Sequence, residues 1–180
     1  MSLIRNSVFL AAASAHMAVD LLNGQRSILL AVLSIPLGLT NSLIGLVSSL
    51  YILSASVSQP LFGEFADRFG PRWVATGGVF WMALMFSMAV TVPGYAALLF
   101  LALAALGSAA FHPAGAMEAT LLGRQRSGGR ETTAASLFFL FGQGGLSIGP
   151  MVGGPILERW GPTGLLLLLF FVVPVGVNAG

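Results

Sequence analysis

The sequence predicts an all-α integral membrane protein with six transmembrane helices, arranged as two inverted three-helix repeats. Of its 180 residues, 56% are hydrophobic and only 8% are charged, whereas globular proteins carry about 25% charged residues. So few charges cannot cover the surface of a soluble domain. In addition, a charged segment in the first half of the chain recurs in outline 91 positions later. The composition therefore predicts a membrane protein, and the recurrence predicts two related units.

Apolar segments that approach the ~20 residues needed to cross a bilayer recur along the whole chain. Turn-forming or charged residues separate them. The expected spans are 6–33, 41–62, 73–92, 95–118, 132–157 and 162–178. We therefore expect residues 1–180 to form a single six-helix bundle, with repeat units of about 1–92 and 93–180.

The first span begins after Arg5, and its small-residue triplet at 13–15 imitates the cleavage site of a secretory signal. The apolar pattern continues past the triplet, so we interpret this segment as a retained span. Pro36 and Gly38 mark its end. Asn41 and Ser42 are the candidate caps of the second helix.

A charged turn at 63–72 is expected between the second and third spans. Glycines at 63 and 70 would allow a tight backbone, and the charges would hold the turn in water, as in any short membrane hairpin. The outline of Gly, acid, Arg, aromatic, Gly and Pro recurs at 154–162, between the fifth and sixth spans. Three spans are an odd number, so the second unit must be inverted relative to the first.

The arginines predict the orientation. If the helices alternate in direction, one side of the membrane carries Arg5, Arg68, Arg72, Arg124, Arg126 and Arg130. Only Arg159 falls in a loop on the other side. The positive-inside rule then places both termini in the cytoplasm.

Several function classes are not supported. The arginines are scattered between apolar runs, so no basic face for nucleic acid is predicted. The chain has no Cys, which excludes disulfides and thiolate metal sites. No phosphate-binding loop, metalloprotease motif or nucleophile elbow occurs, so we expect no enzyme, no cofactor and no metal, and any pumping would use an ion gradient.

Polar residues inside the first span are the main functional candidates. His16 and Asp20 are four apart and share a helix face, which Asn23 continues. An ionised carboxylate at this depth costs at least ~2.5–3.5 kcal/mol, so Asp20 should face a cavity or a partner. Both a proton or substrate role and a structural His–Asp hydrogen bond remain open.

Three further polar residues are candidates for lining a cavity. Arg26 either extends toward the membrane surface or faces the cavity and attracts an anionic group. His112 precedes Pro113 in the fourth span, where it is either a cavity residue or a packed one. Gln143 is the polar side chain of the fifth span best placed to line a cavity.

The fifth span also carries a glycine-rich pattern. Its members are Gly145, Gly149, Pro150, Gly153 and Gly154. Glycines at these spacings let a neighbouring helix approach closely, and the proline adds a bend. Packing and a gating bend are both compatible with this pattern.

These motifs resemble those of a known family. The pattern Gly63, Asp67, Arg68, Gly70 and Arg72 resembles the signature loop of the major facilitator superfamily, with Pro71 where that family usually has a basic residue. The glycine-proline pattern of the fifth span is similar to a motif of antiporters in that superfamily, although Ser136 replaces an upstream glycine. The resemblance implies that Asp67 and Arg68 act in gating or stability.

A subgroup is also indicated, the fosmidomycin-resistance type of drug exporter. The similar segments are 14–16 with Asp20 and Gly24, 111–113, and 136–138 with Gly142 and Gln143. The chain departs from the subgroup at Arg26-Ser27, where an apolar Leu-Pro is usual, and at Ser34-Ile35. The resemblance covers nearly all of this chain but only the first half of a twelve-helix transporter.

Two functions follow from this resemblance as expectations. One is a secondary active transporter, a proton-coupled antiporter that exports a small organic molecule and is present as one six-helix half. Its partners would be membrane lipid, substrate, protons and a second six-helix half, supplied by a C-terminal part, a homodimer mate or another subunit. The alternative is a non-transporting integral subunit that reuses the half-fold. The expected location is the bacterial inner membrane.

Overall fold

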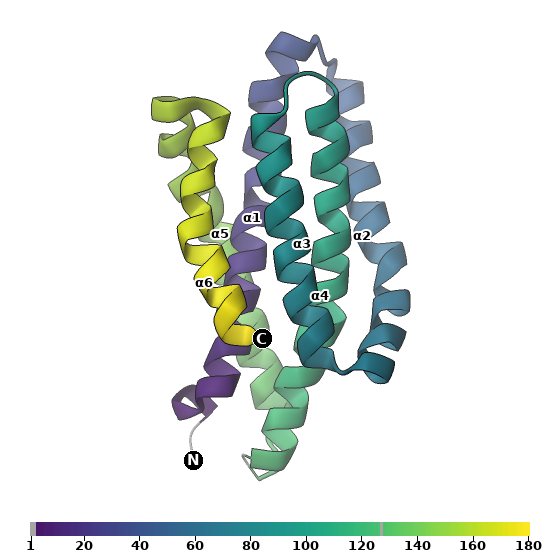
Figure 1. Ribbon diagram of the computed structural model, residues 1–180, viewed down its shortest axis with the longest axis vertical. Helices are drawn as coiled ribbons and strands as arrows, with labels where there is room; N and C mark the ends of the chain where they lie inside the picture. The colour runs from purple at the N-terminus through teal and green to yellow at the C-terminus, as the bar shows by residue number, and fades with distance from the viewer. Residues whose placement is uncertain (1–2, 127) are drawn as a thin grey trace.

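The computed structural model describes residues 3–126 and 128–180, and within these ranges all regular structure is helical. The elements in order are η1 (Leu3–Arg5), α1 (Ser7–Leu37), α2 (Asn41–Phe69), α3 (Pro71–Thr91), α4 (Ala96–Arg126), α5 (Glu131–Gly164), η2 (Leu165–Leu168) and α6 (Leu169–Ala179). The long helices lie roughly along a common axis in one bundle (Figure 1). The predicted all-α class is confirmed.

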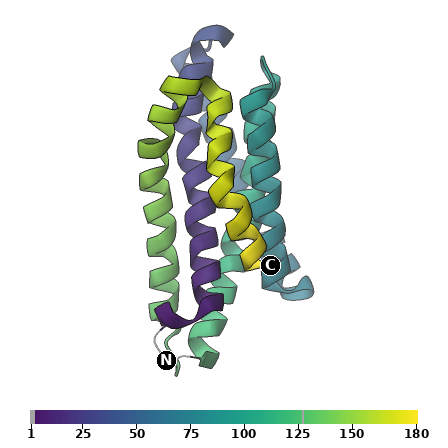
Figure 2. The ribbon, with the colours of Figure 1, turned by 60° about the vertical axis from the view of Figure 1, so that its left-hand side comes forward.

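Five helical segments in the described chain are long and apolar enough to cross a membrane. They are Ser7–Leu37, Asn41–Phe69, Pro71–Thr91, Ala96–Gln125 and the 49-residue stretch Glu131–Ala179. The first four correspond one to one with expected spans. The expected fifth and sixth spans fall together in the last stretch, which leaves helical geometry at Gly161 (φ 66°, ψ −172°). Figure 2 shows the chain reversing direction there, with α6 returning toward the end where α5 begins.

The helix ends extend beyond the expected spans. α1 continues through Pro36 to Leu37 and ends at Gly38 (φ 60°), whose N–H donates to the Ile35 carbonyl at 3.2 Å. Thr40 caps α2, because its Oγ1 accepts from the Leu43 N–H at 3.3 Å. The expectation of Asn41 or Ser42 as the cap was therefore wrong by one or two residues.

The expected ten-residue turn at 63–72 was also wrong. Residues 63–69 complete α2, and Gly70 (φ 93°, ψ 134°) alone separates α2 from α3, which begins at Pro71. Glu64 and Arg68 are four apart and form an ion pair, which suits a helix surface rather than a turn. Gly63 is thus a helical residue, and the chain changes direction between α2 and α3 at Gly70.

The helix α1 packs against each of α2, α3, α4, α5 and α6, and most extensively against α5. Glycines permit the closest approaches: a Cβ on Gly78 of α3 would lie 2.7 Å from the Gly107 carbonyl oxygen of α4. In contrast, α2 buries only Tyr51 and Ala66 of its 29 residues. One side of α2 and much of α5 therefore present uncovered apolar surface.

The topology places most of the arginines at one end of the bundle. The N-terminus, the α2–α3 connection and the α4–α5 connection lie together at the lower end in Figures 1 and 2. These segments contain Arg5, Arg68, Arg72, Arg124 and Arg130. Arg159 lies next to the Gly161 break at the opposite end. The alternation of the expected spans predicts this separation of Arg159 from the other loop arginines.

Candidate functional site

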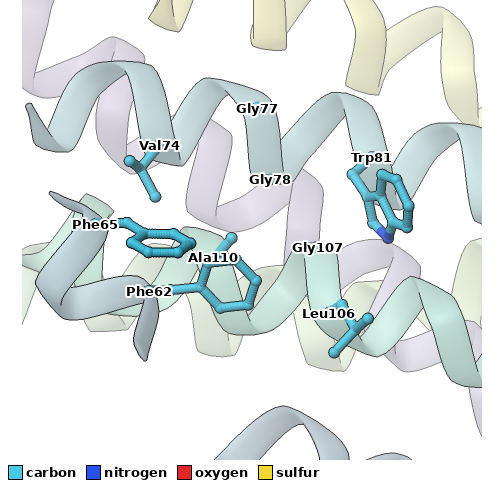
Figure 3. A pocket seen from close by; sticks show the side chains of 9 residues that line it. All are labelled: Phe62, Phe65, Val74, Gly77, Gly78, Trp81, Leu106, Gly107 and Ala110. Carbon is cyan, nitrogen blue, oxygen red and sulfur yellow. The ribbon is translucent and has the colours of Figure 1, made fainter. Parts of the chain in front are cut away.

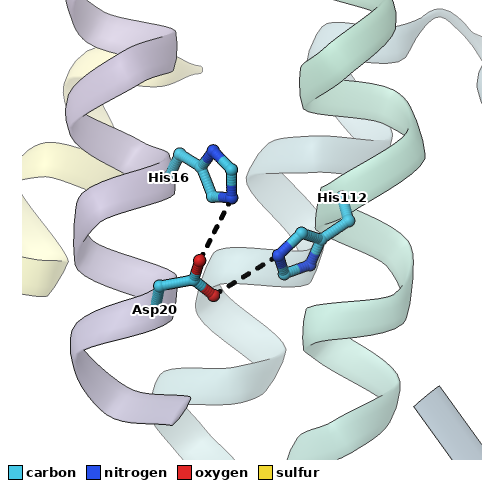
Figure 4. Close-up of side chains that lie close together, drawn as sticks. All are labelled: His16, Asp20 and His112. Carbon is cyan, nitrogen blue, oxygen red and sulfur yellow. Dashed lines mark ion pairs between the residues drawn. The ribbon is translucent and has the colours of Figure 1, made fainter. Parts of the chain in front are cut away.

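A buried carboxylate between two imidazoles forms the centre of the site (Figure 4). The Nε2 atom of His16 lies 3.2 Å from Asp20 Oδ2, and the Nε2 atom of His112 lies 3.3 Å from Asp20 Oδ1. His16 and Asp20 lie four residues apart on α1, whereas His112 lies on α4. Helix periodicity predicted the first pair, and packing of α1 against α4 adds the third member.

The packing of α5 against α1 fixes the position of His16. Its ring stacks on Phe138 with centroids 4.1 Å apart, and its Nδ1 lies 2.8 Å from the Phe138 carbonyl oxygen. Gly142 provides the room, because a Cβ there would collide with the imidazole ring. His16 is only 2% exposed, so its ring has no freedom to turn toward solvent.

The ring of His112 is held in the same way. Its Nδ1 lies 2.7 Å from the carbonyl oxygen of Ser108, one helical turn earlier on α4. A carbonyl oxygen can only accept a hydrogen bond, so the Nδ1 of each histidine must carry a proton. This assignment of tautomers rests on the hydrogen-bond partners. In both rings, Nε2 is the atom left to face Asp20.

This arrangement sets the number of protons that the cluster can hold. Each of the two Nε2–carboxylate contacts needs one proton, on either the nitrogen or the oxygen. With one shared proton the cluster is neutral, and one contact brings two lone pairs together. A second shared proton satisfies both contacts and gives the cluster a charge of +1. The geometry therefore suits the uptake and release of a single proton.

A polar chain extends from Asp20 to α2. Asn23 donates from Nδ2 to Asp20 Oδ1 at 2.8 Å and to Ser108 Oγ at 3.0 Å. The Tyr51 hydroxyl in turn donates to Asn23 Oδ1 at 2.6 Å. Sequence reasoning missed Tyr51 and Ser108. The spacing of four between Ser108 and His112 and the phenol within an apolar span were the available signals.

Five of the six polar candidates in the spans line one cavity of about 320 Å³ between α1, α2, α4 and α5. They are Asp20, Asn23, Arg26, His112 and Gln143. His16 lies behind Asp20 in the packed interior. Tyr51, Ser56 and Ser108 complete the polar part of the wall. The volume lies at the lower end of the range for small-molecule sites.

A second cavity, of about 400 Å³, is apolar. It lies between α2, α3 and α4 and is lined by Phe62, Phe65 and Trp81 with small residues between them (Figure 3). The Trp81 indole N–H is already satisfied by the Leu103 carbonyl at 2.9 Å. Among the residues that the structure describes, no titratable group lines this cavity.

The atoms of the cluster also lie close enough to hold a metal ion. One ligand atom from each of His16, Asp20 and His112 falls within 4.8 Å of the others. However, each Nε2 faces a carboxylate oxygen at hydrogen-bond distance, and Asn23 donates a further hydrogen bond to the same carboxylate. We interpret the three residues as a hydrogen-bonded cluster.

The signature residues at the end of α2 and the start of α3 do not line the cavity at Asp20. Asp67, Arg68 and Arg72 are exposed. Arg68 pairs with Glu64, and the Arg72 Nε donates to the Ala179 carbonyl oxygen at 3.0 Å. The sequence assigned these residues to gating rather than to substrate, and their distance from the cavity lining is compatible with that role.

The glycine pattern of α5 mostly faces α1. A Cβ on Gly149 would lie 2.7 Å from the Leu21 carbonyl oxygen, and one on Gly145 or Gly153 would overlap Met17 or Gln25. Pro150 packs against Gly24 of α1, because a Cβ on Gly24 would lie 2.9 Å from the Cδ of Pro150. In contrast, Gly154 has nothing within 4 Å of its Cβ position and takes no part in this contact.

Comparison with known proteins gives consistent results. A sequence model of the Major Facilitator Superfamily matches residues 3–178. The chain is 29% identical to the fosmidomycin resistance protein of Escherichia coli (strain K12) over 147 residues, which cover 81% of this chain and 35% of that protein. It is 28% identical to the sphingosine-1-phosphate transporter SPNS2 of Xenopus tropicalis over 143 residues, or 70% and 27% of the two chains. The chain thus spans about a third of the length of these relatives.

Proposed function

Because the chain belongs to the Major Facilitator Superfamily, we propose that it is one six-helix half of a secondary transporter that exports a small organic molecule in exchange for protons. The observation that carries the proposal is the buried carboxylate of Asp20, held between two imidazoles at the wall of a cavity. Family membership indicates an integral membrane transporter rather than an enzyme. The relatives' names favour this function over a non-transporting subunit.

Proton exchange is assigned to the cluster of His16, Asp20 and His112. Its neutral and +1 states differ by one proton at an Nε2–carboxylate contact. Around it, α1 contributes the charged Arg26, α2 contributes Tyr51, and α5 contributes the uncharged Gln143 to the same cavity. Asp20 and His112 line the cavity, so a proton can reach the cluster from there.

A second six-helix unit is proposed to cover the apolar faces of α2 and α5 and to close the cavity. A further part of a longer polypeptide, a second copy or another subunit could supply it. The signature residues Asp67, Arg68 and Arg72 would then contact this unit as part of the gate. Such an arrangement would account for the small buried fraction of α2.

The membrane topology is part of the same proposal. Residues after Gly161 form a sixth span, and the two termini and the arginine-rich end of the bundle lie in the cytoplasm. The membrane is the bacterial inner membrane. Two backbone breaks, at Gly70 and at its counterpart Gly161, support two related three-helix units.

Proton flux in proteoliposomes tests the transport proposal. The intact complex that contains this chain is reconstituted with a trapped pH-sensitive dye, and fosmidomycin is the first compound to apply because one relative is named for resistance to it. We expect the compound to drive proton movement and Asp20→Asn to abolish it, because a neutral amide no longer stabilises the proton that the carboxylate shares with an imidazole. The variant should remain folded, since Asn can still accept from Asn23.

The matched control is Glu158→Gln, which removes an exposed carboxylate outside the cavity. It should transport protons at the wild-type rate. Equal rates for Asp20→Asn and the wild type would remove Asp20 from the mechanism. An intact complex that moves no protons with any compound of a broad panel would overturn the transport proposal itself.

A further inference from the structure

Arg26 is a cation without an anionic partner in the described structure. Its guanidinium lies over the Tyr51 ring, with Cζ 4.9 Å from the ring centroid. Its Nε is buried, and no hydrogen-bond acceptor reaches it in the parts of the chain that the structure describes. Both residues line the 320 Å³ cavity. Arg26 therefore faces the cavity, which resolves the two alternatives that the sequence left open.

The energetics require something more than the tyrosine. Placing a cationic side chain at membrane depth is unfavourable unless the charge finds a partner. A single cation–π contact offsets only part of that cost. The nearest carboxylate in the same cavity, Asp20, is already engaged by two imidazoles and by Asn23. Arg26 thus retains both charge and donor capacity.

The chemistry of a guanidinium defines the missing partner. Its planar set of N–H donors matches the oxygens of a carboxylate, phosphate or phosphonate, and such charge-assisted bonds are about twice as strong as neutral ones. Gln143 and Ser56 line the same cavity and can donate to further oxygens. The cavity size suits one small ligand rather than a polymer.

We propose that Arg26 is a substrate-recognition residue and that the transported molecule carries an oxyanion group, which binds to Arg26 above the ring of Tyr51. This assignment rests on the proposed transport function, because the ligand is the transported molecule. Tyr51 is a positioning residue: its ring supports the guanidinium, and its hydroxyl is fixed by Asn23 at 2.6 Å.

Equilibrium binding to the intact complex in detergent, without any pH gradient, tests the assignment. Isothermal titration calorimetry is carried out with methylphosphonate and with acetate, which distinguish the two oxyanion chemistries. Dimethyl methylphosphonate and acetamide are the neutral counterparts. We expect at least one anion to bind, and its neutral counterpart to bind at least tenfold more weakly.

Three variants locate the binding. Arg26→Gln should weaken anion binding at least tenfold, and Arg26→Lys should weaken it less because the charge remains without the planar donor set. The matched control is Arg159→Gln, which removes a second arginine–aromatic contact of the described residues, with Cζ 5.3 Å from the centroid of the Trp160 ring. This control should bind like the wild type. A thermal melt confirms that each variant is folded.

The outcomes separate the two proposals. Wild-type binding by a folded Arg26→Gln or Arg26→Lys variant, equal binding of the neutral compounds, or no anion binding at millimolar concentration would overturn the assignment of Arg26. If Asp20-dependent proton movement persists in that case, the transport proposal stands. Conversely, anion binding that depends on Arg26 without any proton movement would leave an anion site and remove the proton coupling.

Discussion

Replacing Gly145 with alanine tests the contact that positions the site. A Cβ at this residue of α5 would overlap the Met17 carbonyl oxygen of α1, and would lie 2.9 Å from the Met17 carbonyl carbon and 3.0 Å from its Cα. All three atoms are backbone, so no side-chain rotation relieves the overlap. The two helices must separate by roughly 1 Å to restore ordinary van der Waals distances.

The cost follows from packing. Overpacking by one methyl group typically destabilises a protein by about 1–3 kcal/mol, and a backbone obstruction favours the upper part of that range. We expect Gly145→Ala to lower the free energy of unfolding by about 2–3 kcal/mol. Gly154→Ala is the matched control, because nothing lies within 4 Å of its Cβ position on the same helix. Alanine there should be neutral or stabilise α5 by up to about 1 kcal/mol.

Thermal unfolding in detergent, followed by tryptophan fluorescence, measures both variants. At about 2–4 °C per kcal/mol for a chain of this size, Gly145→Ala should melt about 4–12 °C below the wild type. Gly154→Ala should melt at or slightly above the wild-type temperature. If Gly145→Ala melts no lower than Gly154→Ala, the helices do not approach each other as described, and the placement of His16 by α5 loses its support.

Two further predictions concern the ends of helices and use the same thermal assay. Gly70→Ala and Gly161→Ala should each destabilise the protein by about 1–3 kcal/mol, because φ is 93° and 66° at these positions, whereas Gly63→Ala, a helical control, should be tolerated. A tolerated Gly70→Ala would contradict the single-residue break. Thr40→Ala should cost about 0.5–2 kcal/mol through loss of the α2 cap, with Ser42→Ala as the neutral control; equal melting of the two would contradict the capping role.

The sequence predicted the membrane class and the first four helices but not their ends. Hydropathy reports where the chain leaves the hydrocarbon, whereas a helix ends where its backbone hydrogen bonds end. The charged residues Glu64, Asp67 and Arg68 continue α2, and the polar residues 123–126 continue α4, although neither set is apolar enough to be counted as part of a span from hydropathy. The Glu64–Arg68 pair stabilises such an extension. Apolar length therefore underestimates helix length wherever charged residues are themselves good helix formers.

The candidate site, too, could be predicted from the sequence only in part. His16, Asp20 and Asn23 lie on one helix, so the period of 3.6 was enough to group them. The additions of His112 and Ser108 from α4 and of Tyr51 from α2 depend on which helices pack together. Periodicity carries no information about that. The sequence shows that each of these residues is polar within an apolar span, but it does not show which residues each one contacts.

The recurrence along the chain is more informative in the backbone than in its charges. Gly70 and Gly161 are counterparts in the two segments, both have positive φ, and each precedes a proline. Gly63 and Gly154 are also counterparts, and both are helical. The feature common to the two segments is thus a helix broken at one glycine and restarted by a proline, a device that reverses the chain with little loop.

The helix α1 carries both the residues that pack against α5 and the residues of the candidate site. The face that carries Met17, Leu21 and Gln25 receives the glycines of α5. The same helix presents His16 to the Phe138 carbonyl of α5 and Asp20 to His112 of α4. Close approach of α5 is therefore what fixes the proton on His16 Nδ1 and directs Nε2 toward the carboxylate. A shift of α5 along α1 would break that hydrogen bond and free the tautomer of His16, so the contact that holds the helices together also sets how the cluster holds its protons.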